Sequence, residues 1–222
     1  MPKRVLIVAA HADDEVLGCF GTVAGLIDEG YEAYTLILGE GKSAREEESL
    51  AEAQSELSDE MKRANALIGI KEVFTCRFRD NRFDSHDLLD IIKEVERIKE
   101  LIRPEIIFTH SAHDLNIDHR ITAEAVLTAT RPMQNECVKS IYAFEVLSSS
   151  EWNFGKAFTP DTYFDISATL QKKLEAMQCY ASELRKAPHP RSLEGIRTLS
   201  AYRGMQVGYS HAEAFKTLRA LR

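Results

Sequence analysis

The sequence predicts an α/β protein with a three-layer, Rossmann-like fold, in which helices cover both faces of a mostly parallel sheet. Short apolar runs alternate with amphipathic segments five times along the 222 residues, and this alternation is typical of layered α/β folds. The runs are continuous, which suits strands that are buried on both faces of a parallel sheet. With right-handed crossovers, the expected strand order is 3-2-1-4-5.

The first half of the chain is expected to contain three strands and two helices. The run VLIVAA at residues 5–10 predicts the first strand. The segment after it places Val23, Leu26 and Ile27 on one helical face and meets Gly30, a residue type that commonly ends helices. The elements expected after the first strand are a helix at 18–29, a strand at 34–38, a charged helix at 43–67 and a strand at 73–78.

The second half continues the alternation and then loses it. Pro104 and Pro132 each follow a helical pattern and are expected to stop it. The expected elements are a helix at 87–102, a strand at 106–109, a helix at 118–130, a strand at 141–147, one more strand at 163–166, and helices at 169–184 and 192–203. We expect this last third to cover one end of the sheet and to belong to one domain over residues 1–222, because the chain is short for two domains.

Composition excludes several classes of protein. The net charge of −7 lacks the basic surface that a nucleic-acid binder needs. No stretch approaches the ~20 apolar residues of a membrane span, and the apolar run near the N-terminus is shorter than a signal peptide requires. We therefore expect a cytoplasmic enzyme. The four cysteines are spread along the chain without a CxxC pair, which favours neither a cysteine metal site nor a disulfide framework.

Two polar clusters follow the first and fourth predicted strands. They read HADDE at residues 11–15 and HDLNIDH at residues 113–119. Ligands of open parallel sheets bind beyond the carboxyl ends of the strands, where the strand order reverses. In the order 3-2-1-4-5 this point lies between the first and fourth strands, so we expect both clusters to face one crevice.

The two clusters together predict a metal site. Catalytic zinc needs three protein ligands and an open position, and mixed histidine and carboxylate ligands suit it. His11 and Asp14 provide two ligands, and His119 is placed to provide the third. One of the two adjacent aspartates can bind the metal while the other faces the attacking water. Asp118 could orient His119 or its neighbours.

The first cluster has two other interpretations. It could be an acidic loop that caps the next helix. It could also belong to a phosphate-binding turn with Gly18, Gly21 and Thr22. The spacing is not G-x-G-x-x-G, however, and the preceding acids would repel a phosphate.

These motifs resemble those of the PIG-L/LmbE-like deacetylases. HADDE followed by GCFGT resembles the family's AHPDDE-x(2)-G-x-G-GT signature, and DLNIDHR resembles its H-x-D-H signature. EMKRANALIGI and SHAEAFKTLR resemble further segments, so the resemblance extends over nearly the whole chain. It implies a zinc ion held by His11, Asp14 and His119, with Asp13 as the general base. Such enzymes act on N-acetylglucosaminyl compounds, including lipid, thiol-conjugate and oligosaccharide precursors.

The sequence departs from the family pattern at two positions. Ala12 stands where the family has proline, and Asn116 stands where H-x-D-H has its first histidine. That histidine is expected to stabilise the oxyanion. Asn116 can donate a hydrogen bond there but cannot deliver a proton, so His189 in the PHPRS segment, or His113, is expected to take over.

Three further residues are expected to support the site. Asp80 matches a family aspartate after the third strand and could bond the sugar or orient Asn116 or a histidine. Arg45 could reach a substrate phosphate or hydroxyl, with a surface ion pair as the equal alternative. Glu213, in the closing segment, either supports the site or lies on a helix surface.

We therefore expect a zinc-dependent hydrolase that removes an acyl group, most simply acetyl, from an amino-sugar compound. The expected substrates are amino sugars, nucleotide sugars or glycolipids, and an oligomer of identical chains is compatible with the sequence. Another divalent transition metal could replace zinc. A zinc amidase acting on a non-sugar metabolite and a non-catalytic module that binds metal or sugar are the alternatives, because the motifs serve any amide.

Overall fold

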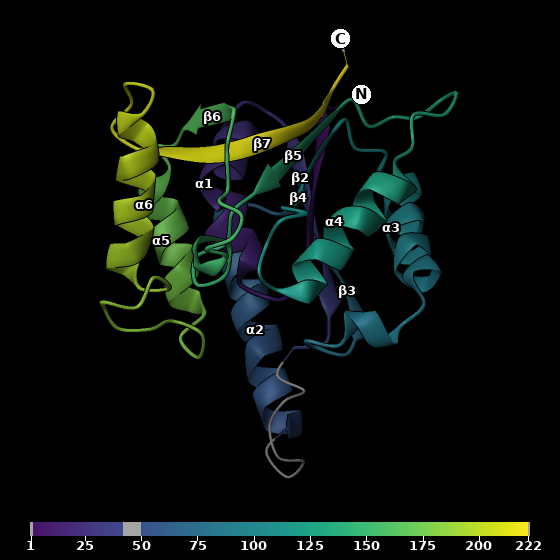
Figure 1. Cartoon of the computed structure of the whole chain (residues 1–222), viewed down its shortest axis with the longest axis horizontal. Helices are drawn as coiled ribbons and strands as arrows, with labels where there is room; N and C mark the ends of the chain where they lie inside the picture. Colours follow the sequence, from purple (N-terminus) through teal and green to yellow (C-terminus); the bar gives the residue numbers. More distant parts are fainter. Residues whose placement is uncertain (1, 42–49, 222) are drawn as a thin grey trace.

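The computed structural model describes residues 2–41 and 50–221, and its described strands form one sheet of seven strands. The order is β3-β2-β1-β4-β5-β7-β6. The strands β1 to β5 are parallel, whereas β7 is antiparallel to both β5 and β6 (Figure 1). The predicted order 3-2-1-4-5 and the mostly parallel sheet are therefore confirmed. The strands are β1 (Arg4–Ala9), β2 (Glu32–Gly39), β3 (Glu72–Phe78), β4 (Ile106–His110), β5 (Ser140–Phe144), β6 (Thr162–Asp165) and β7 (Ala212–Ala220).

Helices cover both faces of the sheet, as the three-layer prediction requires. They are α1 (Asp14–Asp28), α2 (Leu50–Ile68), α3 (Leu88–Ile102), α4 (Ile117–Ala129), α5 (Leu170–Cys179) and α6 (Leu193–Met205), with short 3₁₀ turns at Phe83–Ser85 and Ser150–Trp152. In the described part of the chain, no helix is both long enough and apolar enough to cross a membrane.

The strand β1 separates two hydrophobic cores because its side chains alternate between the two faces of the sheet. Val5 and Ile7 pack in the core beneath α1, α2 and α5. Leu6 and Val8 pack in the other core, beneath α3 and α4. This double burial explains why the strand is a continuous apolar run, and it fixes the loop that follows at the carboxyl edge of the sheet.

The closing strand β7 was not predicted. Its segment AEAFKTLRA contains mainly residues that favour helices, but it pairs with β5 on one side and β6 on the other. Tertiary pairing overrides local propensity here. The alternative that Glu213 lies on a helix surface is wrong, since Glu213 is buried on β7.

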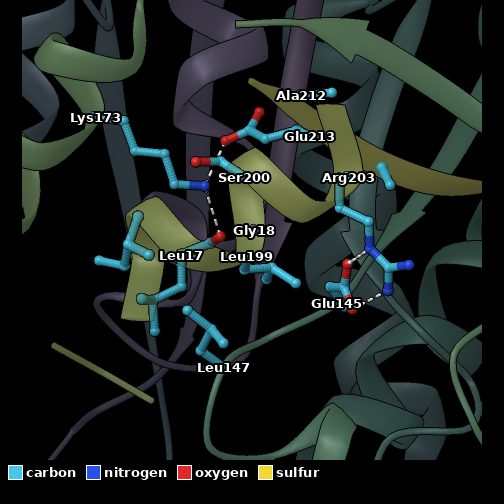
Figure 2. Close-up of a pocket in the computed structure, with 12 residues that line it drawn as sticks. Leu17, Gly18, Glu145, Leu147, Lys173, Leu199, Ser200, Arg203, Ala212 and Glu213 are labelled. Carbon is cyan, nitrogen blue, oxygen red and sulfur yellow. Dashed lines mark hydrogen bonds and ion pairs between the residues drawn. The ribbon is translucent and has the colours of Figure 1, made fainter. Parts of the chain in front are cut away.

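Glu213 ties the C-terminal third to α1. Its carboxylate accepts hydrogen bonds from the backbone N–H groups of Gly21 (3.0 Å) and Thr22 (2.7 Å). It also pairs with Lys173 of α5, whose Nζ donates to the carbonyl of Leu17 at 2.8 Å (Figure 2). The recorded contacts of Glu213 thus stabilise the helix that begins at Asp14 and do not reach the two polar clusters.

Two helices differ from their predicted bounds in ways that affect the site. The first begins at Asp14 instead of Gly18, so the second half of HADDE lies in its first turn. The helix expected at 169–184 ends at Cys179, because Tyr180 turns into the interior and is fully buried. Residues 180–192 instead form the loop between α5 and α6, named here the α5–α6 loop. Residues 43–49 of the charged helix lie outside the described residues.

Candidate functional site

The loop after β1 makes a sharp turn that presents its side chains at the carboxyl edge of the sheet. Asp13 has a left-handed backbone (φ 101°), a conformation that costs free energy for a residue other than glycine. Glu15 stabilises the turn because its Oε2 accepts the N–H of Asp13 at 3.0 Å. The turn thus directs Asp13 and Asp14 to different surroundings.

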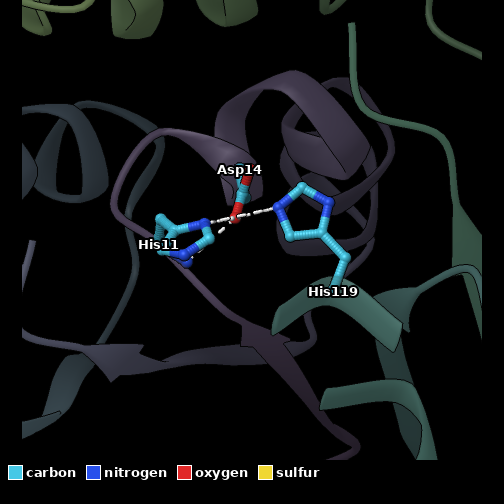
Figure 3. A group of neighbouring side chains, drawn as sticks. All are labelled: His11, Asp14 and His119. Atoms are coloured by element: carbon cyan, nitrogen blue, oxygen red, sulfur yellow. Dashed lines mark hydrogen bonds and ion pairs between the residues drawn. The ribbon is translucent and has the colours of Figure 1, made fainter. Parts of the chain in front are cut away.

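Three side-chain atoms from the two polar clusters meet at one point (Figure 3). His11 Nδ1 and His119 Nε2 each lie 3.3 Å from Asp14 Oδ2. The two nitrogens lie 3.3 Å from each other. The structure therefore brings together the three residues that the sequence assigned to a metal, as an almost regular triangle of possible ligand atoms.

The other ring nitrogen of His11 faces two carboxylates. Its Nε2 lies 3.0 Å from Asp118 Oδ2 and 3.0 Å from Asp80 Oδ1. Asp118 is itself held by the backbone N–H groups of Asn81 (2.7 Å) and Phe83 (3.0 Å). Both acids thus lie within hydrogen-bonding distance of His11, whereas the sequence analysis expected Asp118 to orient His119 or its neighbours.

Space for the His11 ring depends on Gly39 at the end of β2. A Cβ added there would lie 2.8 Å from the carbonyl oxygen of Ala10 and 3.4 Å from His11 Cδ2. A side chain at this position would therefore displace the strand end or the imidazole.

His119 is oriented by Asp114, a residue that the sequence analysis did not single out. His119 Nδ1 lies 3.1 Å from Asp114 Oδ1. The hydroxyl groups of Ser149 and Ser150 donate to the two oxygens of the same carboxylate. Burial raises the pKa of Asp114, but His119 and these hydroxyls lower it, to about 2. The position of Asp114 within the second polar cluster was the available signal.

His110, at the end of β4, is a second residue that the sequence analysis missed. It is fully buried and stacks on His119 with ring centroids 4.0 Å apart. Its Nε2 accepts the backbone N–H of Ala10 at 2.8 Å. Burial lowers the pKa of His110 well below its usual value, and His119 lowers it further. The sequence analysis missed His110 because it falls between the strand expected at 106–109 and the second polar cluster at 113–119.

The charges around the triangle favour a cation. Burial raises the pKa of Asp14, but His119 and His110 lower it well below its usual range. Burial lowers the pKa of His119, whereas Asp14 and Asp114 raise it, to about 9. Likewise burial lowers the pKa of His11, but Asp118, Asp14 and Asp80 raise it well above its usual value. Both imidazoles thus lie in a strongly negative environment.

Asp13 lies in different surroundings from Asp14. Its Oδ2 accepts a hydrogen bond from Arg191 Nη1 at 2.9 Å. Burial raises the pKa of Asp13 to about 8, helped by the charges of Asp14, Glu183 and Glu15 and opposed by Arg191. Arg191 belongs to the PHPRS segment, so this segment does reach the site, but by a residue that the sequence analysis did not name.

The recorded hydrogen bonds of Asn116 and His189, two further residues predicted for the site, do not go to the three possible ligands. Asn116 caps α4, because its Oδ1 accepts the N–H of Asp118 at 2.8 Å, and its Nδ2 donates to Asn81 Oδ1 at 3.1 Å. His189 is half-buried, accepts the N–H of Arg191 at its Nδ1 (3.1 Å) and packs against Trp152.

His113 is exposed, and the hydrogen bonds recorded for it involve its backbone. Arg45 lies outside the described residues.

The sequence also matches a known family and named relatives. Residues 6–130, more than half of the chain, match the family described as PIG-L: GlcNAc-PI de-N-acetylase. The chain is 25% identical to diacetylchitobiose deacetylase from Thermococcus kodakarensis, over 96% of this chain and 82% of that protein. It is 28% identical to a probable N-acetyl-alpha-D-glucosaminyl L-malate deacetylase 2 from Bacillus cereus, over 82% of this chain and 84% of that protein.

A relative named for another kind of reaction has a comparable identity. The chain is 28% identical to 4-oxalmesaconate hydratase from Pseudomonas putida, over 82% of this chain and 74% of that protein. Among solved structures, N,N'-diacetylchitobiose deacetylase from Pyrococcus horikoshii shares the fold, with a TM-score of 0.79 at 20% identity over 98% of this chain and 84% of that chain. The similarities therefore fix the fold and leave the reaction to be argued from the site.

Proposed function

This chain belongs to the PIG-L (GlcNAc-PI de-N-acetylase) family, and we propose that it is a zinc-dependent hydrolase that removes an acetyl group from the nitrogen of an amino-sugar compound. The observation that carries the proposal is the triangle of His11, Asp14 and His119 with a separately held carboxylate, Asp13, in the same turn. Asp13 is not one of the three possible ligands, so its carboxylate remains available to accept a proton.

The donor atoms fit zinc. In tetrahedral coordination with bond lengths of about 2.0–2.1 Å, neighbouring ligand atoms are about 3.3 Å apart, and the three atoms here are 3.3 Å apart. Each imidazole has a carboxylate at its other nitrogen, Asp118 for His11 and Asp114 for His119. Such carboxylates take the ring N–H and leave the lone pair of the inner nitrogen for a metal. Another divalent transition metal would fit the same donors.

The second group of possible ligand atoms shares His11. Asp80 and Asp118 approach its Nε2 closely enough to form a metal-binding group of their own. We assign these acids to the orientation of His11, since Asp118 already accepts two backbone N–H groups.

Zinc bound to His11, Asp14 and His119 would act as a Lewis acid toward the amide carbonyl and toward the attacking water. Asp13 accepts the proton of that water and then donates it to the departing amine. Asn116 orders the start of α4, which carries Asp118 and His119. His189 is the candidate donor to the developing oxyanion, because its Nδ1 accepts from Arg191 and its Nε2 then carries the proton.

The amino-sugar substrate is proposed from the names of the relatives, which include diacetylchitobiose and N-acetylglucosaminyl malate deacetylases. Nucleotide sugars and glycolipids with an N-acetyl group remain in the proposed class. Hydration of a carbon–carbon double bond is the second candidate function, because the hydratase relative is 28% identical and hydration, like hydrolysis, consumes a water molecule.

The test is a substrate screen with the zinc-loaded protein and, as control, its Asp13→Asn variant. N-acetylglucosamine, diacetylchitobiose, N-acetylglucosaminyl malate and a UDP-linked N-acetyl sugar are assayed for free amine and acetate. Equal amounts of both products from a sugar, absent with the control, support the proposal. Release from non-sugar amides alone points to an amidase. Loss of ultraviolet absorbance from an unsaturated dicarboxylate points to a hydratase. Inactivity on all of them points to a binding module.

A further inference from the structure

The α5–α6 loop reaches back to the turn after β1 at two points. Near its start, the hydroxyl of Tyr180 donates to Glu15 Oε1 at 2.5 Å. Near its end, Arg191 donates to Asp13 Oδ2. Glu15 also accepts the N–H of Asp13 through its other oxygen. The backbone and the carboxylate of Asp13 are thus both braced by groups that depend on the α5–α6 loop.

The guanidinium of Arg191 is itself held in place. Its Nε donates to Ser148 Oγ at 3.1 Å, and its Nη1 lies 3.4 Å from Glu183 Oε2 as well as 2.9 Å from Asp13. The carbonyl of Arg191 accepts the N–H of Arg185 at 3.0 Å. Its side chain is partly buried, at 26% exposure. These contacts fix the guanidinium before any substrate arrives.

We propose that Arg191 is a positioning residue for the hydrolysis, which holds one oxygen of the Asp13 carboxylate so that the acid keeps a single orientation beside the metal ligands. This inference rests on the proposed function, in which Asp13 transfers the proton. It assigns the PHPRS segment a role through Arg191, in addition to any role of His189.

The physical need for such a residue follows from the surroundings of Asp13. The terminal torsion of an aspartate is broad, so a free carboxylate would sample many orientations, and proton transfer demands a defined one. Asp14 and Glu15 are adjacent acids in the same buried turn, and their negative charges would repel an unrestrained Asp13. A charge-assisted hydrogen bond from a rigid guanidinium opposes both effects.

The kinetic test compares Arg191→Ala and Arg191→Lys with the parent, all loaded with zinc. We expect kcat of Arg191→Ala to fall roughly 10- to 100-fold, the usual cost of losing a residue that orients a reacting group. KM and zinc content should change little, because the contact lies on the acid and not on the ligands. Arg191→Lys should recover only part of the loss, since an ammonium lacks the fork of a guanidinium.

Arg185→Ala is the matched control. Arg185 lies in the same loop, its side chain is 47% exposed and it lies 3.9 Å from Glu183. Its removal should leave kcat unchanged. Guanidinium chloride, added at concentrations well below those that unfold the protein, should restore part of the activity of Arg191→Ala. If the activity of Arg191→Ala were lost through a general loosening of the loop, added guanidinium would not restore it.

A second measurement needs no substrate. Urea unfolding of the metal-free chain is compared for Arg191→Ala, Asp13→Asn and the double variant. We expect Arg191→Ala to lower the unfolding midpoint in the parent and to have a smaller effect beside Asp13→Asn, because the ion pair is then already lost. Equal shifts in both backgrounds would mean that the contact carries no coupling, and would overturn the proposal.

The kinetic outcomes are equally decisive. If kcat of Arg191→Ala equals or exceeds that of the parent, the positioning role is overturned. A higher kcat would mean that Arg191 restrains Asp13 and slows the reaction. If the parent hydrolyses no acetylated amine, the proposed function fails and the catalytic part of the inference fails with it. The unfolding cycle then still decides whether Arg191 and Asp13 are coupled, so the two failures are distinguishable.

Discussion

Asp13 and Asp14 are neighbours in one turn, yet the molecule gives them opposite surroundings. The histidine side of the site consists of Asp14 and the three imidazoles of His11, His110 and His119, and there the pKa of the carboxyl is held well below its usual range. On the arginine side, the Asp13 carboxyl contacts Arg191 and other acids lie nearby, and its pKa is raised to about 8. The same residue type is thus prepared for two tasks by the partners around it.

The two sides also come from different parts of the chain. The partners of Asp14 follow β1 and β4, so they are set by the parallel half of the sheet. The partners of Asp13 include Arg191, which is 178 residues further along the chain. The two sides should therefore respond differently to substitution. Substitutions on the histidine side should alter metal binding, and substitutions on the arginine side should alter turnover while the metal is retained.

The largest effect is expected from His119→Ala. Without its third ligand the site should lose zinc, and hydrolysis should be abolished. Metal analysis after dialysis and an activity assay measure both. Zinc added after chelation should reactivate the parent but not the variant. At about 1,000 times its Kd, zinc should also stabilise the parent by about 4 kcal/mol, and the variant should lack this gain in thermal unfolding. An unchanged zinc content would remove His119 from the ligands.

Asp13→Asn should reduce turnover by roughly two to four orders of magnitude, the usual loss for a general base, while zinc content stays at the parent level. The amide cannot take up the proton of the attacking water. Rates of acetate release and metal analysis on the same samples measure the two quantities. Parent-like turnover would remove Asp13 from the proton-transfer role, and loss of zinc would erase the distinction between the two sides.

His189→Ala should lower kcat by roughly 10²- to 10³-fold if the ring donates to the oxyanion, again with zinc retained. His113→Ala is the matched control, because His113 is an exposed histidine of the second polar cluster and its loss should leave kcat unchanged. Steady-state kinetics at saturating substrate provide the comparison. If His189→Ala loses less than about 100-fold, the range expected for a lost positioning contact, His189 serves only to hold the loop through Arg191 and Trp152.

Asp114→Asn should have the smallest effect, a loss of about 10- to 100-fold in zinc affinity, as expected for a residue that orients a metal-bound histidine. The neutral amide would hold His119 Nδ1 less firmly than the buried carboxylate does. Competition with a zinc chelator gives the affinity. Ser149→Ala should weaken binding less, since Ser150 still donates to Asp114. An unchanged zinc affinity in Asp114→Asn would show that the contacts of His119 with Asp14, His11 and His110 are enough to orient its ring.

The pattern of residues was enough to predict the layered fold, the order of five strands and the convergence of His11, Asp14 and His119. It could do so because buried strands leave a continuous apolar pattern, and because the loops at the carboxyl ends of parallel strands must meet where the order reverses. Each of these signals is local to a few residues or follows from a general rule of chain connection.

Four further features could be found only in the packed chain: the strand β7, the contact of Asp114 with His119, the stacking of His110 on His119 and the contact of Arg191 with Asp13. The helix-favouring segment of β7 forms a strand because it pairs with β5 on one side and β6 on the other. The charge state of an acid depends on its burial and on which cations lie beside it, and both are properties of the packed chain. For that reason the adjacent letters DD could not reveal that Asp13 is held by an arginine 178 residues further along the chain.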